Sequence, residues 1–285
     1  MDWQLRQACY AGFRIVKHAI LRNLPNRCML CSQDIEPYDL QKPHSGVCQH
    51  CLVAGLYQHE VCLGCGKAMM LLQRYCGQCQ STEPIMVIAP CSYHQGLGEL
   101  IAAIKYQQQC ASLAALVQVL AIRVMDLVSR DMIQLPQVLI PVPLHPNRLK
   151  SRGFNQAWLI AKALSQQLGI VMDDALLVRD VDTQAQAGLD GKARRLNCAG
   201  AFSLNLNASS SNTSSSKTSS SNTSSLNTLS SNTVAKRVPY QRIALIDDVV
   251  TTGTTVNEIS QLFAAEYVHV QCWCLARAEA PGLLK

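Results

Sequence analysis

The chain contains 285 residues, which is enough for one large domain or two modest domains with an ample core. Charged residues account for 15% and hydrophobic residues for 48% of the chain, a balance that excludes a largely disordered protein. The formal net charge of +6 permits an anionic partner but does not require one.

The beginning of the chain predicts a helix rather than a targeting segment. Apolar residues recur near helical spacing through residues 1–24, so we expect an amphipathic helix there. Charged residues scattered through the same stretch break the continuous apolar core that a signal peptide needs. The most apolar segment further on, residues 111–128, contains Gln118, Arg123 and Asp126, which argues against a membrane span. These features predict a cytoplasmic protein whose cysteines are reduced.

Eight of the fourteen cysteines form four C-x-x-C pairs in residues 25–83, which we interpret as a zinc-ribbon module. Two such pairs supply the four thiolates of a tetrahedral zinc site, and a site made only of cysteine is structural rather than catalytic. Pairing in sequence order gives two zinc ions. Pairing the first with the third and the second with the fourth, or binding a single zinc, also fits the spacing. The expected ligands are Cys28, Cys31, Cys48, Cys51, Cys62, Cys65, Cys76 and Cys79.

Strand and helix patterns alternate from residue 84 onward, which predicts an α/β domain with a mainly parallel sheet flanked by helices over residues 84–285. Lys105 falls at the end of one predicted helix, where we favour a solvated side chain over a phosphate contact. The expected strands cover residues 85–89, 138–142, 243–246 and 268–276, and the expected helices cover residues 97–106, 111–128 and 154–168.

A basic segment follows the predicted strand at residues 138–142. Arg148, Lys150 and Arg152 place three cations within five residues, and we expect a proline-stiffened loop here, with Gly153 opening the next helix. Cations beside the start of a helix are typical of an anion-binding site, and a plain basic surface loop is the alternative.

The most informative stretch runs from Arg242 to Val256. A short apolar strand is followed by Asp247 and Asp248, then by a loop of small residues, and then by a helical pattern. The loop and helix start favour a phosphate, whereas two carboxylates would repel it unless they accept hydrogen bonds from sugar hydroxyls or hold a divalent metal. A phosphorylated sugar with a cis-diol satisfies both halves, and a strand-to-helix turn with capping threonines is the alternative. The loop residues are Val249, Val250, Thr251, Thr252, Gly253, Thr254 and Thr255.

This stretch resembles the 5-phosphoribosyl-1-pyrophosphate (PRPP) motif of type I phosphoribosyltransferases. The resemblance implies that Asp247 and Asp248 contact the ribose hydroxyls and that the loop that follows cradles the 5-phosphate. With the PVP and R-x-K-x-R-G-F-N-Q segments and the four C-x-x-C pairs, the chain from Cys28 to Arg277 resembles the ComF/GntX family. These are bacterial competence-associated, phosphoribosyltransferase-like proteins with an amino-terminal zinc finger, so the resemblance implies a link to the uptake of transforming DNA.

The resemblance also implies an activity. Residues 179–202 resemble the mobile loop that closes over PRPP, and Lys192, Arg194 and Arg195 would join the basic segment in meeting the pyrophosphate, with Mg²⁺ carried by PRPP. We therefore expect transfer of the phosphoribosyl group to an amine or nucleobase. The alternative is a non-catalytic sensor of PRPP or a nucleotide, whose zinc module binds single-stranded DNA or a competence helicase.

A five-residue repeat rich in serine, threonine and asparagine covers residues 209–233 and predicts a disordered insertion over residues 207–234, because it cannot bury apolar surface. We interpret it as the widened turn of a hairpin between a strand ending near Leu206 and the strand starting near Arg242.

Overall fold

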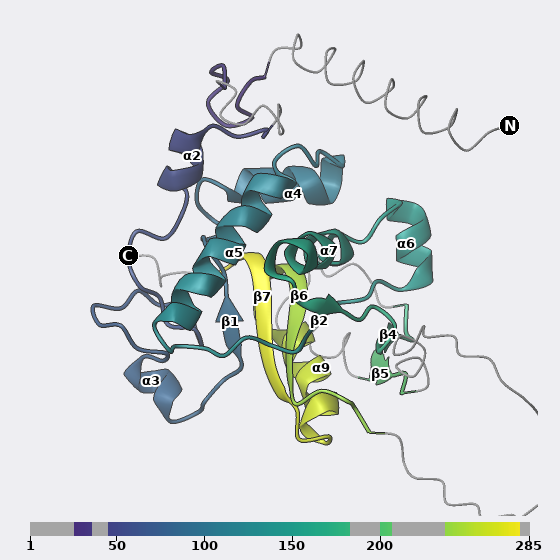
Figure 1. Ribbon diagram of the computed structural model, residues 1–285. Helices are drawn as coiled ribbons and strands as arrows, with labels where there is room; N and C mark the ends of the chain where they lie inside the picture. The colour runs from purple at the N-terminus through teal and green to yellow at the C-terminus, as the bar shows by residue number, and fades with distance from the viewer. Residues whose placement is uncertain (1–25, 36–44, 183–199, 207–236, 280–285) are drawn as a thin grey trace, which may run out of the picture. The chain divides into compact units, whose positions relative to one another are not determined.

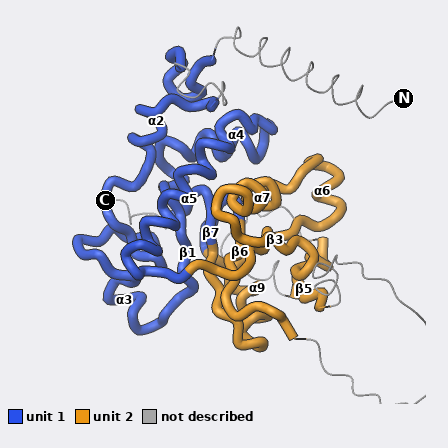
Figure 2. Tube along the Cα trace, in the orientation of Figure 1, with its two compact units in different colours: residues 1–134, 247–252, 273–285 blue, residues 135–246, 253–272 orange. Residues whose placement is uncertain are grey.

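The computed structural model describes residues 26–35, 45–182, 200–206 and 237–279 (Figure 1). The predicted amino-terminal helix, the three cations from Lys192 to Arg195 and the serine-rich repeat therefore lie outside the described residues. The chain divides into two compact units, which Figure 2 shows in different colours. Unit 1 comprises residues 1–134, 247–252 and 273–285, and unit 2 comprises residues 135–246 and 253–272.

Unit 1 is built mainly from helices around an apolar core. Its longest helix buries Leu116, Leu120, Val124 and Leu127, which recur at helical spacing along one face, and it packs against a strand whose three residues are all buried. The elements are α2 (Gln49–Ala54), α3 (Gly77–Gln80), β1 (Met86–Ile88), α4 (Gly98–Gln107) and α5 (Leu113–Ser129).

Unit 2 contains parallel strand pairs joined by helices. Strand β2 (Val138–Pro141) is fully buried and pairs in parallel with both β3 (Val171–Met172) and β6 (Arg242–Val250). Helix α7 (Gln156–Leu168) connects β2 to β3 and packs on both, as a parallel crossover requires. Helix α9 (Thr254–Ala264) follows β6.

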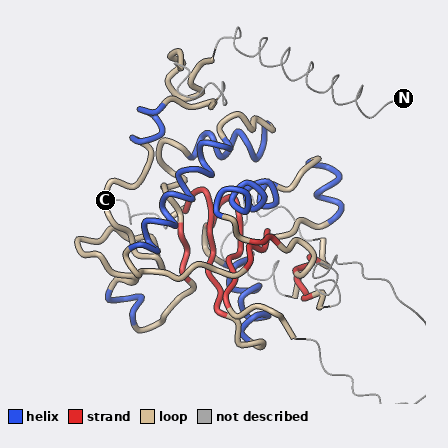
Figure 3. The backbone as a smooth tube through the Cα atoms, in the orientation of Figure 1, coloured by secondary structure: helices blue, strands red, loops and turns tan. Residues whose placement is uncertain are grey.

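Five strands form one sheet in the order β1-β7-β6-β2-β3, where β7 spans His269–Arg277. Figure 3 draws the strands in red and the helices in blue. The predicted α/β class with a parallel sheet flanked by helices is confirmed. Strand β6 is longer than predicted, because it continues past Ile246 to Val250. Asp247 and Asp248 therefore lie within the strand rather than after it. Within the described residues, no helix is long and apolar enough to cross a membrane.

The predicted hairpin around the serine-rich repeat is wrong. Strand β5 (Phe202–Leu204) pairs antiparallel with β4 (Leu177–Arg179) in a separate two-stranded sheet, with Arg179 opposite Phe202. The physical reason is that both edges of β6 are already hydrogen-bonded, one to β2 and the other to β7, so no edge is left for β5.

The basic segment is a helix, not the predicted loop. Helix α6 (Pro146–Arg152) begins with proline at its first position, and Nδ1 of His145 accepts a hydrogen bond from the backbone N–H of Asn147 at 3.3 Å. Gly153 ends this helix instead of opening the next one, with φ of +84°. Helix α7 begins only after Asn155, whose side chain caps it. Pro146 and the capping side chain of His145 thus begin a helix, where the sequence predicts a loop stiffened by prolines.

Candidate functional site

The first cysteine cluster brings together Cys28, Cys31, Cys48 and Cys51, whose Sγ atoms all lie within 4.8 Å of one another. The Sγ atoms of Cys31 and Cys48 are 3.8 Å apart. Cys48 also starts helix α2, where its Sγ accepts a hydrogen bond from the N–H of Cys51 at 3.4 Å. Four sulfurs at these separations fit one tetrahedral zinc ion.

The second cluster repeats this arrangement with Cys62, Cys65, Cys76 and Cys79. The Sγ atoms of Cys65 and Cys76 are 3.7 Å apart. The cysteines are therefore grouped in sequence order, and the interleaved alternative is wrong. Both donor sets fit structural zinc, and neither includes a histidine or carboxylate that would mark a catalytic metal.

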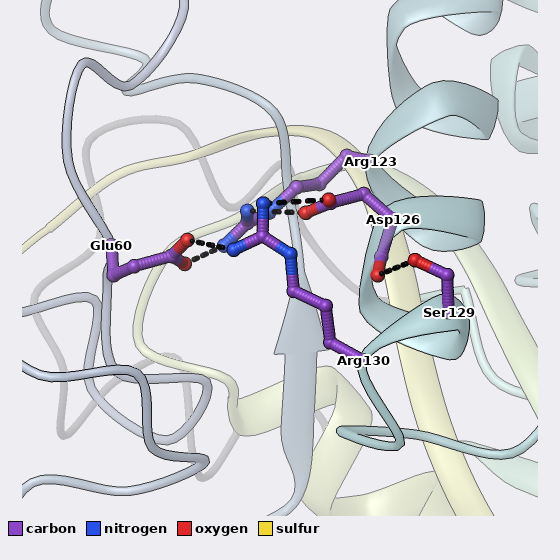
Figure 4. A network of polar contacts seen from close by, with 5 residues as sticks. All are labelled: Glu60, Arg123, Asp126, Ser129 and Arg130. Atoms are coloured by element: carbon purple, nitrogen blue, oxygen red, sulfur yellow. Dashed lines mark hydrogen bonds and ion pairs between the residues drawn. The ribbon is translucent and has the colours of Figure 1, made fainter.

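An ion-pair network attaches the second cluster to helix α5 (Figure 4). Arg123 and Arg130 donate to Glu60, two positions before Cys62, with N–O distances of 2.8 and 2.9 Å. Both arginines also pair with Asp126 on the same helix. The hydrogen bond from Arg123 holds the pKa of Glu60 below its usual range. The network thus fixes the segment that carries the second cysteine cluster to the longest helix of unit 1.

Strand β7 supplies a second attachment for this cluster. The guanidinium group of Arg277 donates to the backbone carbonyls of Leu63 and Gly64, between Cys62 and Cys65. Nearby, the buried carboxylate of Glu279 accepts hydrogen bonds from the hydroxyls of Tyr57 and Ser92. These contacts join the cysteine-rich segment to the end of β7 within unit 1.

Lys105, which the sequence predicts to be solvated, forms an ion pair with Asp248 of the acid pair in β6. The Nζ atom of Lys105, in the last turn of α4, lies 2.9 Å from Oδ2 and 3.2 Å from Oδ1 of Asp248. The prediction of a solvated Lys105 is therefore wrong. Asp248 is 8% exposed, so its charge is held out of bulk water beside an opposite charge.

Asp247 lies in a different electrostatic setting from its neighbour. Its Oδ1 atom accepts a hydrogen bond from the backbone N–H of Asp248 at 2.8 Å. Burial and the negative charge of Asp248 raise the pKa of Asp247 from 3.8 to about 7, although Lys105 opposes this change. One carboxyl of the pair thus exchanges its proton near neutral pH.

The loop after β6 turns sharply into a helix. Thr251 and Thr252 are exposed, and Gly253 has φ of +72°, a left-handed conformation that favours glycine. The N-cap position of helix α9 is Gly253, which has no side chain that could cap the first turn. Two exposed threonines therefore lie just before the amino-terminal end of helix α9, which is the positive end of the helix dipole.

The other predicted site residues differ in their surroundings. The side chain of Val250 is buried and its backbone carbonyl accepts a hydrogen bond from Ala278, whereas Val249 is half-buried. On α6, Lys150 is exposed, and Arg148 and Arg152 are half-buried. The N–H of Val142 donates to the carbonyl of Ile246 at 2.9 Å. The carboxyl end of β2, from which the chain continues to α6, therefore lies beside the part of β6 that is followed by the acid pair.

Comparison with known proteins identifies the class to which the chain belongs. No family model matches it. Competence protein F of Haemophilus influenzae is 34% identical over 256 residues, covering 88% of this chain and 97% of that protein. The DNA utilization protein YhgH of Escherichia coli O157:H7 is 29% identical over 257 residues, covering 89% and 98%. The chain therefore belongs to the ComF/GntX family of competence-associated, phosphoribosyltransferase-like proteins, as its motifs predict.

The solved structures that are similar to this chain include the adenine phosphoribosyltransferase of Leishmania tarentolae. It has 16% sequence identity and a TM-score of 0.30, and the match covers 61% of this chain and 59% of that one. This TM-score is too low to define the fold, which is described above from the strand order and pairing alone.

Proposed function

We propose that the chain binds PRPP at the end of β6 and transfers its 5-phosphoribosyl group to an amine or a nucleobase, releasing pyrophosphate. The observation that carries this proposal is the order of three features along the chain: two adjacent carboxyls, a small-residue loop with a left-handed glycine, and the first turn of helix α9. This order suits a ligand that has hydroxyls at one end and a phosphate at the other.

The acid pair and the loop have separate roles in the proposed complex. Asp247 and Asp248 accept hydrogen bonds from the 2- and 3-hydroxyls of the ribose. The 5-phosphate binds to the backbone and hydroxyls of residues 251–255, where the dipole of α9 favours an anion. Gly253 permits the phosphate to approach the backbone closely, because it has no Cβ and no atom lies within 4 Å of the place where a Cβ would be. A residue with a Cβ would also be strained at this positive φ.

Cations stabilise the departing pyrophosphate in this proposal. Arg148, Lys150 and Arg152 lie on the helix that follows β2, and the three further cations from Lys192 to Arg195 lie outside the described residues. Mg²⁺, bound to the pyrophosphate of PRPP, supplies further neutralisation of the leaving group. Groups of this kind lower the barrier by meeting charge where it develops.

The bond changes follow from the substrate. The bond from the anomeric carbon to the pyrophosphate oxygen breaks, with the electron pair leaving on oxygen, and positive charge develops on the ribose ring. A bond from the acceptor nitrogen to the same carbon then forms, and that nitrogen gives up a proton. We assign no general base among the described residues.

The names of the relatives suggest the biological setting. One relative is named a competence protein and another a DNA utilization protein. We therefore propose that the activity serves the uptake or use of DNA, and that it takes place in the cytoplasm, where clustered cysteines bind zinc rather than form disulfides.

Incubation of the purified chain with isotope-labelled PRPP, Mg²⁺ and a panel of amines and nucleobases tests the activity. We expect pyrophosphate release that depends on one acceptor and is lost in Asp248→Asn. Calorimetric titration with PRPP should show binding that Asp247→Ala weakens at least tenfold. Equal titration curves for wild type and Asp247→Ala would reject the site.

A second candidate function is a sensor that binds PRPP without turnover while its zinc module binds single-stranded DNA or a helicase. The exposed apolar side chains of Met70, Leu71 and Leu72, between the cysteines of the second cluster, favour it, because such tips are typical of contact surfaces. Under this alternative, Met70→Ser with Leu71→Ser lowers affinity for single-stranded DNA or a helicase, whereas Ile122→Ser on α5 does not. PRPP binding without pyrophosphate release for any acceptor would favour the sensor.

A further inference from the structure

Among the described residues, Lys105 contacts the acid pair in a way that the proposed function does not explain. Its side chain is 25% exposed and that of Asp248 is 11% exposed, so both charges are largely removed from water. A lysine in the last turn of a helix usually extends into solvent, because burying an ammonium group is unfavourable unless it is paired. A specific opposing charge therefore holds Lys105 in this position.

The packing of α4 explains how the lysine reaches β6. Leu100, Ile101 and Ile104 form the buried face of this helix, and Lys105 follows directly after Ile104. Its position four residues after Ile101 places it on the edge of that buried face. Burial alone would lower the pKa of Lys105, but the carboxylates of Asp248 and Asp247 outweigh this effect and raise it, so the group stays charged.

The contacts also fix the orientation of Asp248. Its Oδ1 atom accepts hydrogen bonds from the backbone N–H of Val249 at 2.9 Å and from Nζ of Lys105 at 3.2 Å, while Oδ2 lies 2.9 Å from the same Nζ. Both oxygens of this carboxylate therefore have a defined direction before any ligand binds.

We propose that Lys105 is a positioning residue of the pentose-phosphate site, and that its ammonium group neutralises part of the acid pair so that an anionic sugar phosphate can bind without a divalent cation. This inference rests on the proposed function. The carboxylate of Asp248, together with that of Asp247 when it is ionised, places negative charge at the start of a phosphate-binding loop and opposes the ligand. The paired ammonium group of Lys105 cancels one of these charges.

The test measures anion binding in buffer without added Mg²⁺, with two probes. Ribose 5-phosphate, followed by calorimetry, carries both the diol and the phosphate. Inorganic phosphate, followed by ³¹P NMR, has no diol and therefore reports the charge of the site alone. We expect Lys105→Met to weaken both probes at least tenfold and Lys105→Arg to stay within about threefold of wild type. The loss in Lys105→Met should shrink as ionic strength rises.

The double variant Lys105→Met with Asp248→Asn separates charge from structure. It restores the net charge of the wild-type pair, so phosphate should bind within about threefold of wild type. A purely structural lysine would leave the double variant as weak as Lys105→Met or weaker. Should Lys105→Met fail to fold, the double variant and Lys105→Arg decide the question, and a tenfold loss of phosphate binding in the double variant overturns the inference.

The result also separates this inference from the proposed function. If wild type binds ribose 5-phosphate and Lys105→Met binds it equally well, the role of Lys105 is rejected while the site stands. If wild type binds neither ribose 5-phosphate nor PRPP, the proposed function fails, and the inference fails with it.

Discussion

Arg123 donates from Nη2 to Oε2 of Glu60 across 2.8 Å, although the two residues are 63 positions apart in the chain. Glu60 precedes the second cysteine cluster, and Arg123 lies in the middle of α5. A zinc module is often treated as independent of the rest of a protein, but here one carboxylate accepts from Arg123 of the longest helix and from Arg130, the C-cap residue of that helix. The second cluster and that helix should therefore unfold together.

Removing the Glu60 charge should destabilise unit 1. Glu60→Gln eliminates the ion pairs with Arg123 and Arg130, but both arginines keep Asp126 as a partner. Because the groups are only partly buried, we expect the free energy of unfolding in urea to fall by about 1 kcal/mol. The second cluster should also release zinc to a chelator faster than in wild type.

The matched control is Glu99→Gln, the same chemical change at an exposed position in the first turn of α4. That carboxylate interacts only weakly with the helix dipole, so the free energy of unfolding should fall by about 0.5 kcal/mol or less. Equal losses for the two variants, with unchanged zinc release, would show that the Glu60 network does not stabilise the cluster.

The grouping of cysteines predicts the zinc content of double variants. Cys31→Ser with Cys48→Ser removes two ligands from one cluster and should leave one zinc per chain, because the second cluster is intact. Cys31→Ser with Cys65→Ser damages both clusters and should leave none. Elemental analysis of the purified proteins measures the ratio.

Interleaved pairing would reverse these two results, so a single pair of measurements distinguishes the arrangements. Cys110→Ser serves as the control, because this cysteine is exposed and lies outside both clusters. It should keep the wild-type zinc content of two per chain.

Local patterns in the sequence predicted the elements well, and long-range contacts less well. The strand, loop and helix around Gly253 follow from residues that are neighbours in the chain, so their order was predictable. Lys105 and Asp248 are separated by 143 positions, and no local pattern signals that one pairs with the other. The lysine at the end of an apolar helix was the available signal, and solvation is its usual outcome.

The remaining errors have similar physical causes. The short pairing of Arg179 with Phe202 belongs to two three-residue strands, which are too brief to show an alternating pattern. The proline-rich sequence around Pro146 predicts a loop, but proline is also common in the first turn of a helix, and here it begins α6. The spacing of the cysteines allowed two pairings, and only the folded chain distinguishes them.

Asp247 should make stability depend on pH in an identifiable direction. Its pKa of about 7 in the folded state lies above the value near 4 that is usual for an unfolded chain. The folded protein therefore binds more protons between these values, and its stability is greatest below about pH 4 for this group and falls as pH rises to about 7. Burial and the charge of Asp248 raise this pKa, and the charge of Lys105 opposes the increase.

Comparison with Asp247→Asn isolates this contribution from the thiolates, which also titrate. In urea unfolding at pH 5 and pH 8, wild type should lose roughly 2 kcal/mol relative to the variant over this interval. A constant difference between the two proteins across the range would show that Asp247 has an ordinary pKa.

Gly253→Ala should impair ligand binding by more than its cost in stability suggests. The new Cβ would meet no atom within 4 Å, so no clash arises, but φ of +72° is unfavourable for alanine by roughly 1 kcal/mol. Relief of that strain would shift the loop that the ligand is proposed to contact.

Gly169→Ala is the matched control. Gly169 has φ of +70°, its surroundings are equally open, and it lies at the end of α7, away from the proposed phosphate site. We expect both variants to lose about 1 kcal/mol in urea unfolding, and only Gly253→Ala to weaken PRPP binding, at least tenfold by calorimetry. Equal PRPP affinities in the two variants would mean that the phosphate does not bind at this turn.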